Sequence, residues 1–306
     1  MKALVFGGTG WVGHRIALAL AEDGYEVTVC SRGGMTEFSA AVSSLRQLRA
    51  DKNNPAELER IFAGERYDLV VDSVPSEASI QGVANHARGL KHYLHCSSTG
   101  GYAPLPFLPG DETAPYPGFA VSWMQKKRVD ELAMGLFQQT GFPATIIRPC
   151  YISGPGKNPL DNLGGRRNDF IADIQAEKEL DVVNDGQALL QPIHVDDLAA
   201  AFVLAARSSR QSIGQIYNIC LEKAVTLNRY LEISASTLNV GVKLHHLPLE
   251  AMLQKYTGKI DEIGLRFLAQ HMCFDITKAK TQLGFRPRHS TAETIEENAR
   301  WSAALK

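Results

Sequence analysis

The sequence lacks the patterns that mark disulfide-rich, zinc-binding and membrane-spanning proteins. Its five cysteines, Cys30, Cys96, Cys150, Cys220 and Cys273, are scattered and form no CxxC pair, so we expect reduced, mostly buried thiols and no metal site. No apolar run approaches the roughly 20 residues of a membrane helix, and the N-terminal apolar segment is too short and broken for a secretory signal. We therefore expect a cytoplasmic protein that does not bind membranes.

An excess of charge of one sign is also missing. The 32 Lys and Arg residues and 33 Asp and Glu residues leave a formal net charge of -1, which provides no global field to attract nucleic acid. A small-molecule partner is expected instead, and a homodimer is left open. With 306 residues, 44% of them hydrophobic and 21% charged, the chain is typical of a compact globular protein with one large or two unequal domains.

Short apolar segments alternate with segments of helical periodicity over the first half of the chain. This rhythm predicts an α/β fold with a doubly wound parallel sheet that has helices on both faces. The predicted strands are 3–6, 27–30, 67–72, 92–96 and 144–148, and the predicted helices are 11–21, 56–62, 79–89 and 123–140.

A glycine-rich turn lies between the first predicted strand and the first predicted helix. Gly7, Gly10 and Gly13 have the spacing GxxGxxG. Glycine tolerates a positive φ and lets the backbone approach a pyrophosphate, which the N-terminus of the helix attracts. We therefore predict a dinucleotide site to which Thr9, Trp11 and Val12 also contribute.

The second predicted strand ends without the acidic residue that usually binds the ribose of NAD. The stretch 29–33 instead contains Ser31 and Arg32. A planar, permanently charged guanidinium suits a phosphate, so NADP(H) is predicted over NAD(H). If Arg32 were only a solvated loop residue, the preference would stay undecided.

The regular alternation ends after residue 150. Loop-forming stretches follow, and residues 193–195, a helix at 198–206 and a strand at 215–219 indicate a return to the sheet. We expect a dinucleotide-binding domain over residues 1–150, completed by parts of 193–220. Residues 151–306 should form a smaller substrate-binding lobe interleaved with it.

Taken together, these motifs resemble the extended and atypical short-chain dehydrogenases/reductases, the superfamily of NAD(P)-dependent epimerases and dehydratases with a Rossmann fold. Within this superfamily, the motifs are most similar to those of the branch that contains the chloroplast stem-loop-binding proteins. Beyond the glycine turn, the resemblance rests on SSTGGY at 97–102, RP at 148–149, GPG at 154–156, HVDDLA at 194–199 and LGFRP at 283–287. It implies that Asp51, Ser73, Pro149 and Ile152 contact the cofactor.

The resemblance also implies a catalytic set. Members of the superfamily use a Ser or Thr and a Tyr-x-x-x-Lys pair, in which the lysine holds the nicotinamide ribose and the phenol exchanges a proton with the substrate. Ser98 and Lys127 match this pattern, whereas Trp123 stands in place of the tyrosine and its indole cannot relay a proton. Tyr102, Tyr116 and Tyr151 are the candidate replacement phenols, and a water held by Ser98 or the substrate itself are the other possible sources of the proton.

Further residues bear on the substrate. Tyr151 and His194, together with Ser98 and Trp123, are expected to line its site. Leu190 occupies the position of the arginine that meets the diphosphate in nucleotide-sugar enzymes, and Arg166 and Arg167 are either an alternative clamp or solvated surface.

Two classes of function remain. The first is an NADP(H)-dependent oxidoreductase, a reductase of a small apolar carbonyl or unsaturated substrate. The second is a non-catalytic cofactor-binding, RNA-binding or regulatory member of the superfamily. A nucleotide-sugar epimerase or dehydratase is disfavoured by Trp123 and Leu190.

Overall fold

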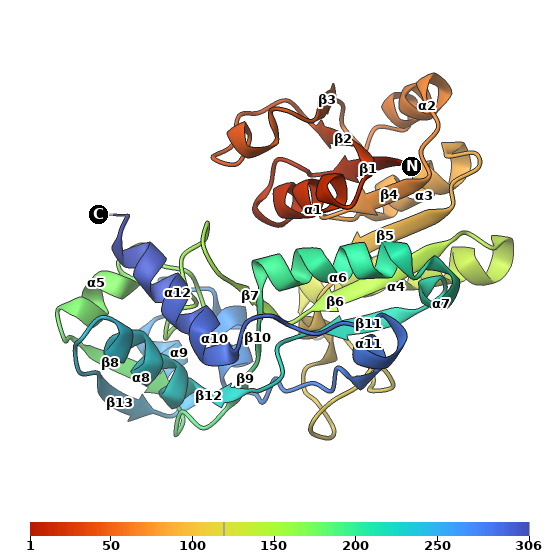
Figure 1. Ribbon diagram of the computed structural model, residues 1–306. Coiled ribbons are helices and arrows are strands. Elements are labelled where there is room, and N and C mark those ends of the chain that lie inside the picture. The colour runs from red at the N-terminus through yellow and green to blue at the C-terminus, as the bar shows by residue number, and fades with distance from the viewer. Residues whose placement is uncertain (119, 306) are drawn as a thin grey trace.

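The computed structural model describes residues 1–118 and 120–305. Its largest sheet consists of seven parallel strands, built from the short apolar runs of the sequence (Figure 1). From one edge to the other their order is β11 (Ile216–Ile219), β6 (Ala144–Pro149), β5 (His92–Cys96), β4 (Leu69–Asp72), β1 (Lys2–Phe6), β2 (Glu26–Ser31) and β3 (Arg46–Arg49).

Helices cover both faces of this sheet, and each face has its own apolar core. On one face, α1 (Trp11–Glu22) and α6 (Val195–Arg207) pack together over the strands, in the foreground of Figure 1. On the other face lie α2 (Pro55–Gly64), α3 (Glu77–His86) and α4 (Val121–Thr140). The doubly wound parallel fold predicted from the sequence is confirmed.

The C-terminal part has a further core of its own, made of buried apolar side chains, and lies beside the main sheet in Figure 1. It is interleaved with the main sheet, because β11 and α6 come from its middle and α11 (Thr277–Gln282) packs on β11. The domain boundary at residue 150 stays a prediction. The remaining elements are η1 (Ala40–Val42), η2 (Thr99–Tyr102), β7 (Tyr151–Ser153), α5 (Phe170–Gln175), β8 (Glu179–Val183), β9 (Leu189–Leu190), β10 (Pro192–His194), α7 (Ser209–Ser212), β12 (Val225–Thr226), α8 (Leu227–Thr237), β13 (Lys243–Leu247), α9 (Leu249–Lys255), α10 (Glu262–Leu268) and α12 (Thr291–Ala303).

The loop between η2 and α4 covers one edge of the sheet. The N–H of Asn218 in β11 donates to the Glu112 carboxylate at 2.7 Å. Gly110 of the same loop forms a backbone bridge with Phe274. The loop is thereby held against the edge strand on one side and the C-terminal segment on the other.

The expectation that all five cysteines are free thiols is wrong for two of them. Cys150 follows β6 and Cys220 follows β11, and these two residues form a disulfide. Parallel pairing of β6 with β11 places the two residues side by side, which their spacing in the sequence does not reveal. Cys30, Cys96 and Cys273 are free.

The helices that the structure describes include none with the length and apolar character needed to cross a membrane. The cytoplasmic location stays a prediction.

Candidate active site

The glycine turn between β1 and α1 has a geometry that fits a pyrophosphate. Gly7 has a φ of 71°, and its N–H donates to the carbonyl of Cys30 at 3.0 Å. A Cβ at Gly13 would collide with the carbonyl group of Gly7, so α1 and the turn can approach this closely only with glycine. Among the described residues no side chain caps α1 at Gly10, which leaves N–H groups of its first turn available to an anion.

The other residues predicted to contact the cofactor near the turn lie around it. The Ser73 hydroxyl donates to the carbonyl of Phe6 at 2.9 Å, directly beneath Gly7. The indole N–H of Trp11 donates to the Pro155 carbonyl at 2.8 Å, and the Thr9 carbonyl accepts the hydroxyl of Thr36 at 2.6 Å. Val12 lies in the first turn of α1. Cofactor contacts of these residues stay predictions.

Two arginines lie at the end of β2, where an adenosine ribose would bind. Arg32 is exposed, and its carbonyl accepts a hydrogen bond from Nε of Arg49 at 3.2 Å. Arg49 comes from the neighbouring strand β3, and its side chain lies against Gly33. The second arginine was missed at the sequence level because β3 itself was not predicted. Together the two cations provide a setting suited to a 2′-phosphate.

Asp51 follows β3, where the resemblance places the adenine ring. Its carboxylate accepts the N–H of Asn53 at 2.9 Å, which shapes the turn before α2. The next residue, Lys52, forms an ion pair with the fully buried Asp72 at the end of β4 and also contacts the carbonyl of Val74. This ion pair, which the sequence analysis missed, fixes the two strand ends relative to each other.

Ser98 and Tyr116 meet beyond the end of β5. The Ser98 hydroxyl accepts the N–H of Gly100 at 3.1 Å and caps η2. The Tyr116 hydroxyl donates to the Ser98 carbonyl at 2.7 Å. Burial raises the pKa of Tyr116, and the charge of Asp130 acts in the same direction. The phenol is therefore protonated at neutral pH.

A buried charged network lies beneath these two residues. The Arg148 guanidinium is paired with the Asp130 carboxylate at 2.9 Å and lies 3.6 Å from the centre of the Tyr116 ring. Burial opposes ionisation of Asp130, but hydrogen bonds from His95 and Ser97 and the charge of Arg148 hold its pKa below the usual value. The network supports the Tyr116 ring from below.

The structure corrects the role predicted for Tyr102. Its ring is fully buried, and its hydroxyl accepts a hydrogen bond from Nη1 of Arg148 at 2.7 Å. A phenol enclosed in this way contacts the protein rather than a substrate. Tyr102 therefore supports the network, and Tyr116 is the phenol that remains at the site.

Two neighbouring lysines of α4 have different surroundings, and the role predicted for Lys127 stays a prediction. Lys127 lies 3.8 Å from the exposed Glu131, so its ammonium points along the outer side of α4. The buried face of the helix carries Asp130, and Lys126 lies one turn before it. Burial raises the pKa of Cys96 at the end of β5 to about 11, and the positive charge of Lys126 acts against this shift. Lys126 is therefore close enough to the end of β5 for its charge to act there, which makes it a second candidate for the lysine of the site.

Taking Lys126 as the lysine of the site would also change the residue at the tyrosine position. Four residues before Lys126 stands Ser122, which is exposed, whereas Trp123 was predicted there. The Trp123 indole packs against Gly100 of η2 and stacks on Phe267 of α10, with ring centroids 5.4 Å apart. Trp123 thus joins α4 to the C-terminal lobe beside Ser98.

Pro149, Ile152 and Tyr151 lie at the carboxyl end of β6 and in β7. The Pro149 carbonyl accepts the Thr99 hydroxyl at 3.3 Å. Arg166 donates to the Ile152 carbonyl at 2.6 Å and lies over the ring of Tyr151. The hydroxyl of Tyr151 accepts the N–H of Leu160 at 2.6 Å, so this side chain organises the loop after β7. Contacts of these residues with cofactor or substrate stay predictions.

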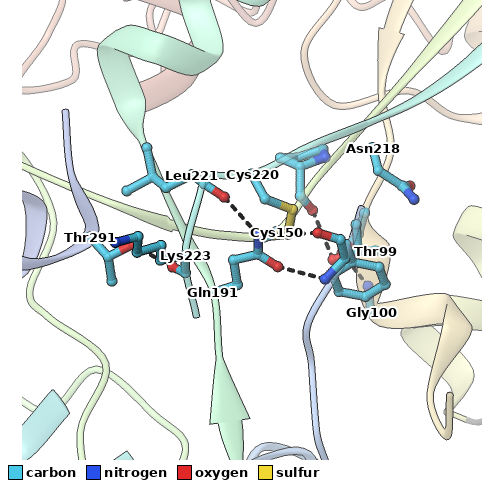
Figure 2. Close-up of a disulfide and its surroundings, with 12 residues drawn as sticks. Thr99, Gly100, Cys150, Gln191, Asn218, Cys220, Leu221, Lys223 and Thr291 are labelled. Atoms are coloured by element: carbon cyan, nitrogen blue, oxygen red, sulfur yellow. Dashed lines mark hydrogen bonds between the residues drawn. A yellow bond between two sulfur atoms is a disulfide. The ribbon is translucent and has the colours of Figure 1, made fainter. Parts of the chain in front are cut away.

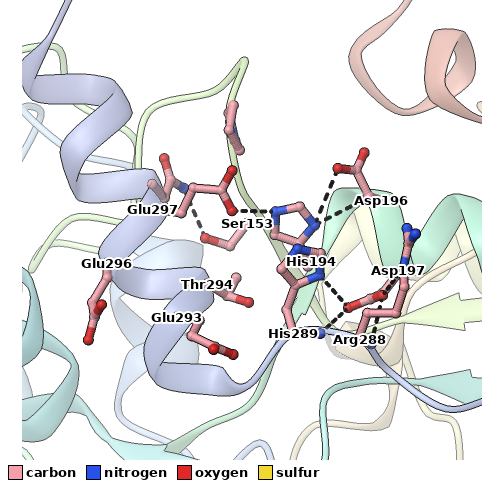
Figure 3. Close-up of polar contacts among 12 residues, drawn as sticks. Ser153, His194, Asp196, Asp197, Arg288, His289, Glu293, Thr294, Glu296 and Glu297 are labelled. Atoms are coloured by element: carbon pink, nitrogen blue, oxygen red, sulfur yellow. Dashed lines mark hydrogen bonds and ion pairs between the residues drawn. The ribbon is translucent and has the colours of Figure 1, made fainter.

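His194 lies among Asp196, His289 and Glu297 (Figure 3), which argues against its predicted place in the substrate site. Its ring is fully buried, caps α6 through the N–H of Asp196 and contacts Glu297 of α12 at 3.1 Å. It stacks on His289 with ring centroids 3.7 Å apart. Burial, and then the nearby His289, lowers the pKa of His194. The side chain connects α6 to the C-terminal segment.

His194, His289 and Asp197 are close enough together to be considered as metal ligands. However, the Asp197 carboxylate already accepts the backbone N–H groups of Arg288 and His289 and contacts the ring of His289 at 2.9 Å (Figure 3). Nδ1 of His194 accepts a backbone N–H. These atoms are used to join two segments of the chain, and the group fits a metal poorly.

Leu190, Arg166 and Arg167 are the residues that the sequence analysis related to binding of a diphosphate. Leu190 is buried in the core of the C-terminal lobe. Arg167 is surrounded by the carboxylates of Asp161, Asp169 and Asp173. Arg166 donates to the carbonyls of Ile152 and Asn158. Arg166 and Arg167 are therefore both engaged with groups of the protein, and the position of the usual clamp carries the apolar Leu190.

Comparisons with known proteins agree with this architecture. A family model described as "NAD dependent epimerase/dehydratase family" matches residues 3–82 and 78–220. The chain is 27% identical to the chloroplast stem-loop binding protein of 41 kDa b of Arabidopsis thaliana, over 97% of this chain and 78% of that protein. It is 26% identical to the 2'-dehydrokanamycin reductase of Streptomyces kanamyceticus, over 66% of this chain and 56% of the relative.

A solved structure shares the fold over its whole length. The UDP-glucuronic acid 4-epimerase from Bacillus cereus, in complex with NAD, superposes with a TM-score of 0.78 at 17% identity. The match covers 100% of this chain and 99% of that one.

Proposed function

Because the chain belongs to the NAD dependent epimerase/dehydratase family, we propose that it is an NADP(H)-dependent oxidoreductase that reduces a small, relatively apolar carbonyl or unsaturated compound. The observation that carries this proposal is the placement of Tyr116, a protonated phenol 2.7 Å from the Ser98 carbonyl and above the buried Arg148. In the structure this phenol donates its proton to the Ser98 carbonyl. On substrate binding it would turn the proton to a substrate oxygen at the sheet edge where the cofactor's nicotinamide would lie.

The direction of the reaction follows from the protonation of Tyr116. The reduced nicotinamide supplies the hydride when the cofactor is bound. A phenol with a raised pKa is a poor base for removing a proton from an alcohol. It is, however, a competent acid toward the far more basic alkoxide that forms when a carbonyl is reduced. At neutral pH Tyr116 is therefore in the protonation state that the reductive direction requires.

Ser98 and Lys126 complete the set of residues that would position the reactants. The Ser98 hydroxyl accepts the Gly100 N–H, so its own proton is available to a substrate oxygen. Lys126 is close enough to the end of β5 for its charge to act there and would hold the nicotinamide ribose through its three N–H donors. Ser122 carries only an aliphatic hydroxyl, which is too weak an acid to replace Tyr116.

The surroundings of this set favour a planar or apolar substrate. Trp123 stacks on Phe267 beside Gly100, which presents aromatic surface between α4 and α10. At the position of Leu190 the family's usual arginine is replaced by a buried apolar side chain. A nucleotide sugar would lack that partner for its diphosphate, which argues against epimerase or dehydratase activity.

The preference for NADP(H) is part of the proposal. The Arg49 side chain reaches the backbone carbonyl of Arg32 at the end of β2, and the stretch 29–33 contains no acid that would accept the ribose hydroxyls of NAD. A 2′-phosphate bound beside these two arginines would gain charge-assisted hydrogen bonds.

Tyr116→Phe tests the proposed function. Turnover of a panel of small carbonyl compounds with NADPH should fall about 100-fold or more, because general acid catalysis contributes at least that much, while the NADPH affinity should stay unchanged. Trp123→Phe is the matched aromatic control and should keep most of the activity. Full activity of Tyr116→Phe would contradict the assignment of this phenol.

The same panel of carbonyl compounds distinguishes an oxidoreductase from a non-catalytic protein. A relative named as a stem-loop binding protein covers 97% of this chain, so a non-catalytic, RNA-binding member is the second candidate. NADPH binding without turnover of any compound, combined with binding of a stem-loop RNA, would favour this second function.

A further inference from the structure

The disulfide between Cys150 and Cys220 lies at the carboxyl ends of the strands, where doubly wound folds bind their ligands. The two Cα atoms are 5.4 Å apart although 70 residues separate them in sequence. The N–H of Cys150 donates to the carbonyl of Ile219 at 3.1 Å. The bond therefore ties the end of the edge strand β11 to the end of β6.

One side of the disulfide adjoins the proposed active site (Figure 2). Cys150 directly follows Pro149, whose carbonyl accepts the hydroxyl of Thr99 at 3.3 Å. Thr99 begins η2 and follows Ser98. A change in the position of Cys150 is therefore transmitted through one hydrogen bond to the segment that carries Ser98.

The other side adjoins the C-terminal lobe (Figure 2). Leu221 follows Cys220, its N–H donates to the Pro192 carbonyl at 2.8 Å, and its carbonyl accepts the Gln191 amide at 2.6 Å. The amide oxygen of Gln191 accepts the N–H of Phe274 at 2.6 Å. The disulfide thus connects the segment that carries Ser98 to the segment around Gln191, where the two lobes meet.

From this placement we propose that Cys150 and Cys220 are a redox-active pair through which a dithiol controls cofactor binding. The oxidised pair holds the Pro149–Thr99 contact in the arrangement seen here and gives the tighter NADPH site. Reduction removes the covalent link between the ends of β11 and β6, leaves only their backbone pairing, and weakens that site. The proposal rests on the proposed function only in taking NADPH as the ligand.

The chemistry begins at Cys150, because this residue is 7% exposed and Cys220 is fully buried. A thiolate of the dithiol attacks Sγ of Cys150, the S–S bond breaks, and Sγ of Cys220 leaves and takes up a proton. The second thiol of the reagent then displaces Cys150 from the mixed disulfide. Two electrons and two protons pass from the dithiol to the pair, and the dithiol becomes a cyclic disulfide.

The three free cysteines are poor nucleophiles for attack on the disulfide between Cys150 and Cys220. Burial raises the pKa of Cys30 to about 12 and that of Cys96 to about 11, so neither forms a thiolate near neutral pH. Burial also raises the pKa of Cys273. Burial therefore slows thiol–disulfide exchange at each of these three cysteines.

The first measurement counts thiols by alkylation in denaturant followed by mass spectrometry. The protein purified without reductant should carry three free thiols, and dithiothreitol should raise the number to five. Five thiols in the unreduced protein, even after treatment with oxidised dithiothreitol, would overturn the proposal without any cofactor experiment.

The second measurement compares NADPH affinity in the two states. Reduction should weaken binding about fivefold or more, the scale of ordinary coupling between sites. By reciprocity NADPH should lower the midpoint potential of the pair, and a fivefold effect corresponds to about 20 mV for two electrons. Cys150→Ser and Cys220→Ser should bind NADPH as the reduced protein does, with or without dithiothreitol, and Cys273→Ser should respond like the wild type.

The outcomes distinguish the two proposals. Equal NADPH affinity in the oxidised and reduced protein would overturn the redox control and leave the proposed function intact. Absence of NADPH binding in every form would overturn the proposed function and the control of cofactor binding together.

Discussion

Lys126 and Lys127 are neighbours in the chain but have different surroundings. Lys126 is close enough to the end of β5 for its charge to act on Cys96, whereas Lys127 is engaged with Glu131 on the outer side of α4. Since an ammonium can orient a ribose only if it reaches the strand ends, one residue of helical rotation decides which lysine serves the cofactor.

Lys126→Ala should therefore remove turnover and weaken NADPH binding about tenfold, because the ribose loses its charged donor. Lys127→Ala should change both quantities less than twofold, since its exposed ion pair contributes little. Isothermal titration with NADPH and steady-state kinetics check the two variants. The reverse result would restore Lys127 to the catalytic set.

The arginine at the end of β2 gives a second prediction for a single residue. Arg32→Ala should lower NADPH affinity about tenfold, the low end for a charge-assisted contact because the side chain is exposed, and leave NADH affinity unchanged. Arg46→Ala is the matched control, since this exposed arginine of β3 is paired with Glu65. An equal loss for NADH and NADPH in Arg32→Ala would contradict a 2′-phosphate contact.

Among the elements, α4 depends on one buried carboxylate. Asp130 contacts Arg148, His95 and Ser97 and so fixes the helix to β5 and β6. Removing it would leave the guanidinium of Arg148 buried without a counter-charge, which is strongly destabilising.

Asp130→Ala should therefore lower the free energy of unfolding by about 3–5 kcal/mol. Glu131→Ala, on the exposed side of the same helix, should lower it by less than about 0.5 kcal/mol. Urea denaturation followed by circular dichroism measures both. Similar small losses in the two variants would show that the buried network contributes little.

The same helix shows why part of the site could not be predicted from the sequence. Lys126 and Asp130 have the same spacing as Lys127 and Glu131, so spacing alone permits both pairs, and only the burial of Asp130 distinguishes them. The apolar runs predicted β1, β2, β5 and β6 well. By contrast, β3 has the sequence RQLR and is largely exposed, so it has no apolar pattern to recognise. The disulfide depends on the pairing of strands far apart in sequence, which a local pattern does not contain.

At the scale of the whole molecule, three histidines give the fold a dependence on pH. Burial lowers the pKa of His92 to about 4 and lowers the pKa of His14 and His194 as well. In the unfolded chain each would titrate near 6.5. The unfolded state therefore binds more protons below about pH 6.5, and stability falls as the pH decreases.

Between pH 7 and pH 5 the contribution of His92 alone should cost about 2 kcal/mol of unfolding free energy. Urea denaturation at the two pH values measures the loss, and His92→Gln should reduce it by a similar amount. A wild-type protein equally stable at both pH values would show that these histidines are protonated without penalty.

The contact between Glu112 and Asn218 has a consequence for the behaviour of the protein in concentrated solution. An edge strand with unpaired N–H groups can add a strand from another molecule and so begin aggregation. The carboxylate of Glu112 accepts a hydrogen bond from one of these N–H groups on β11. Burial raises the pKa of the Glu112 carboxyl group. Because the same loop carries Tyr116, a molecule whose loop has opened would lose its proton donor and also expose a surface that favours self-association.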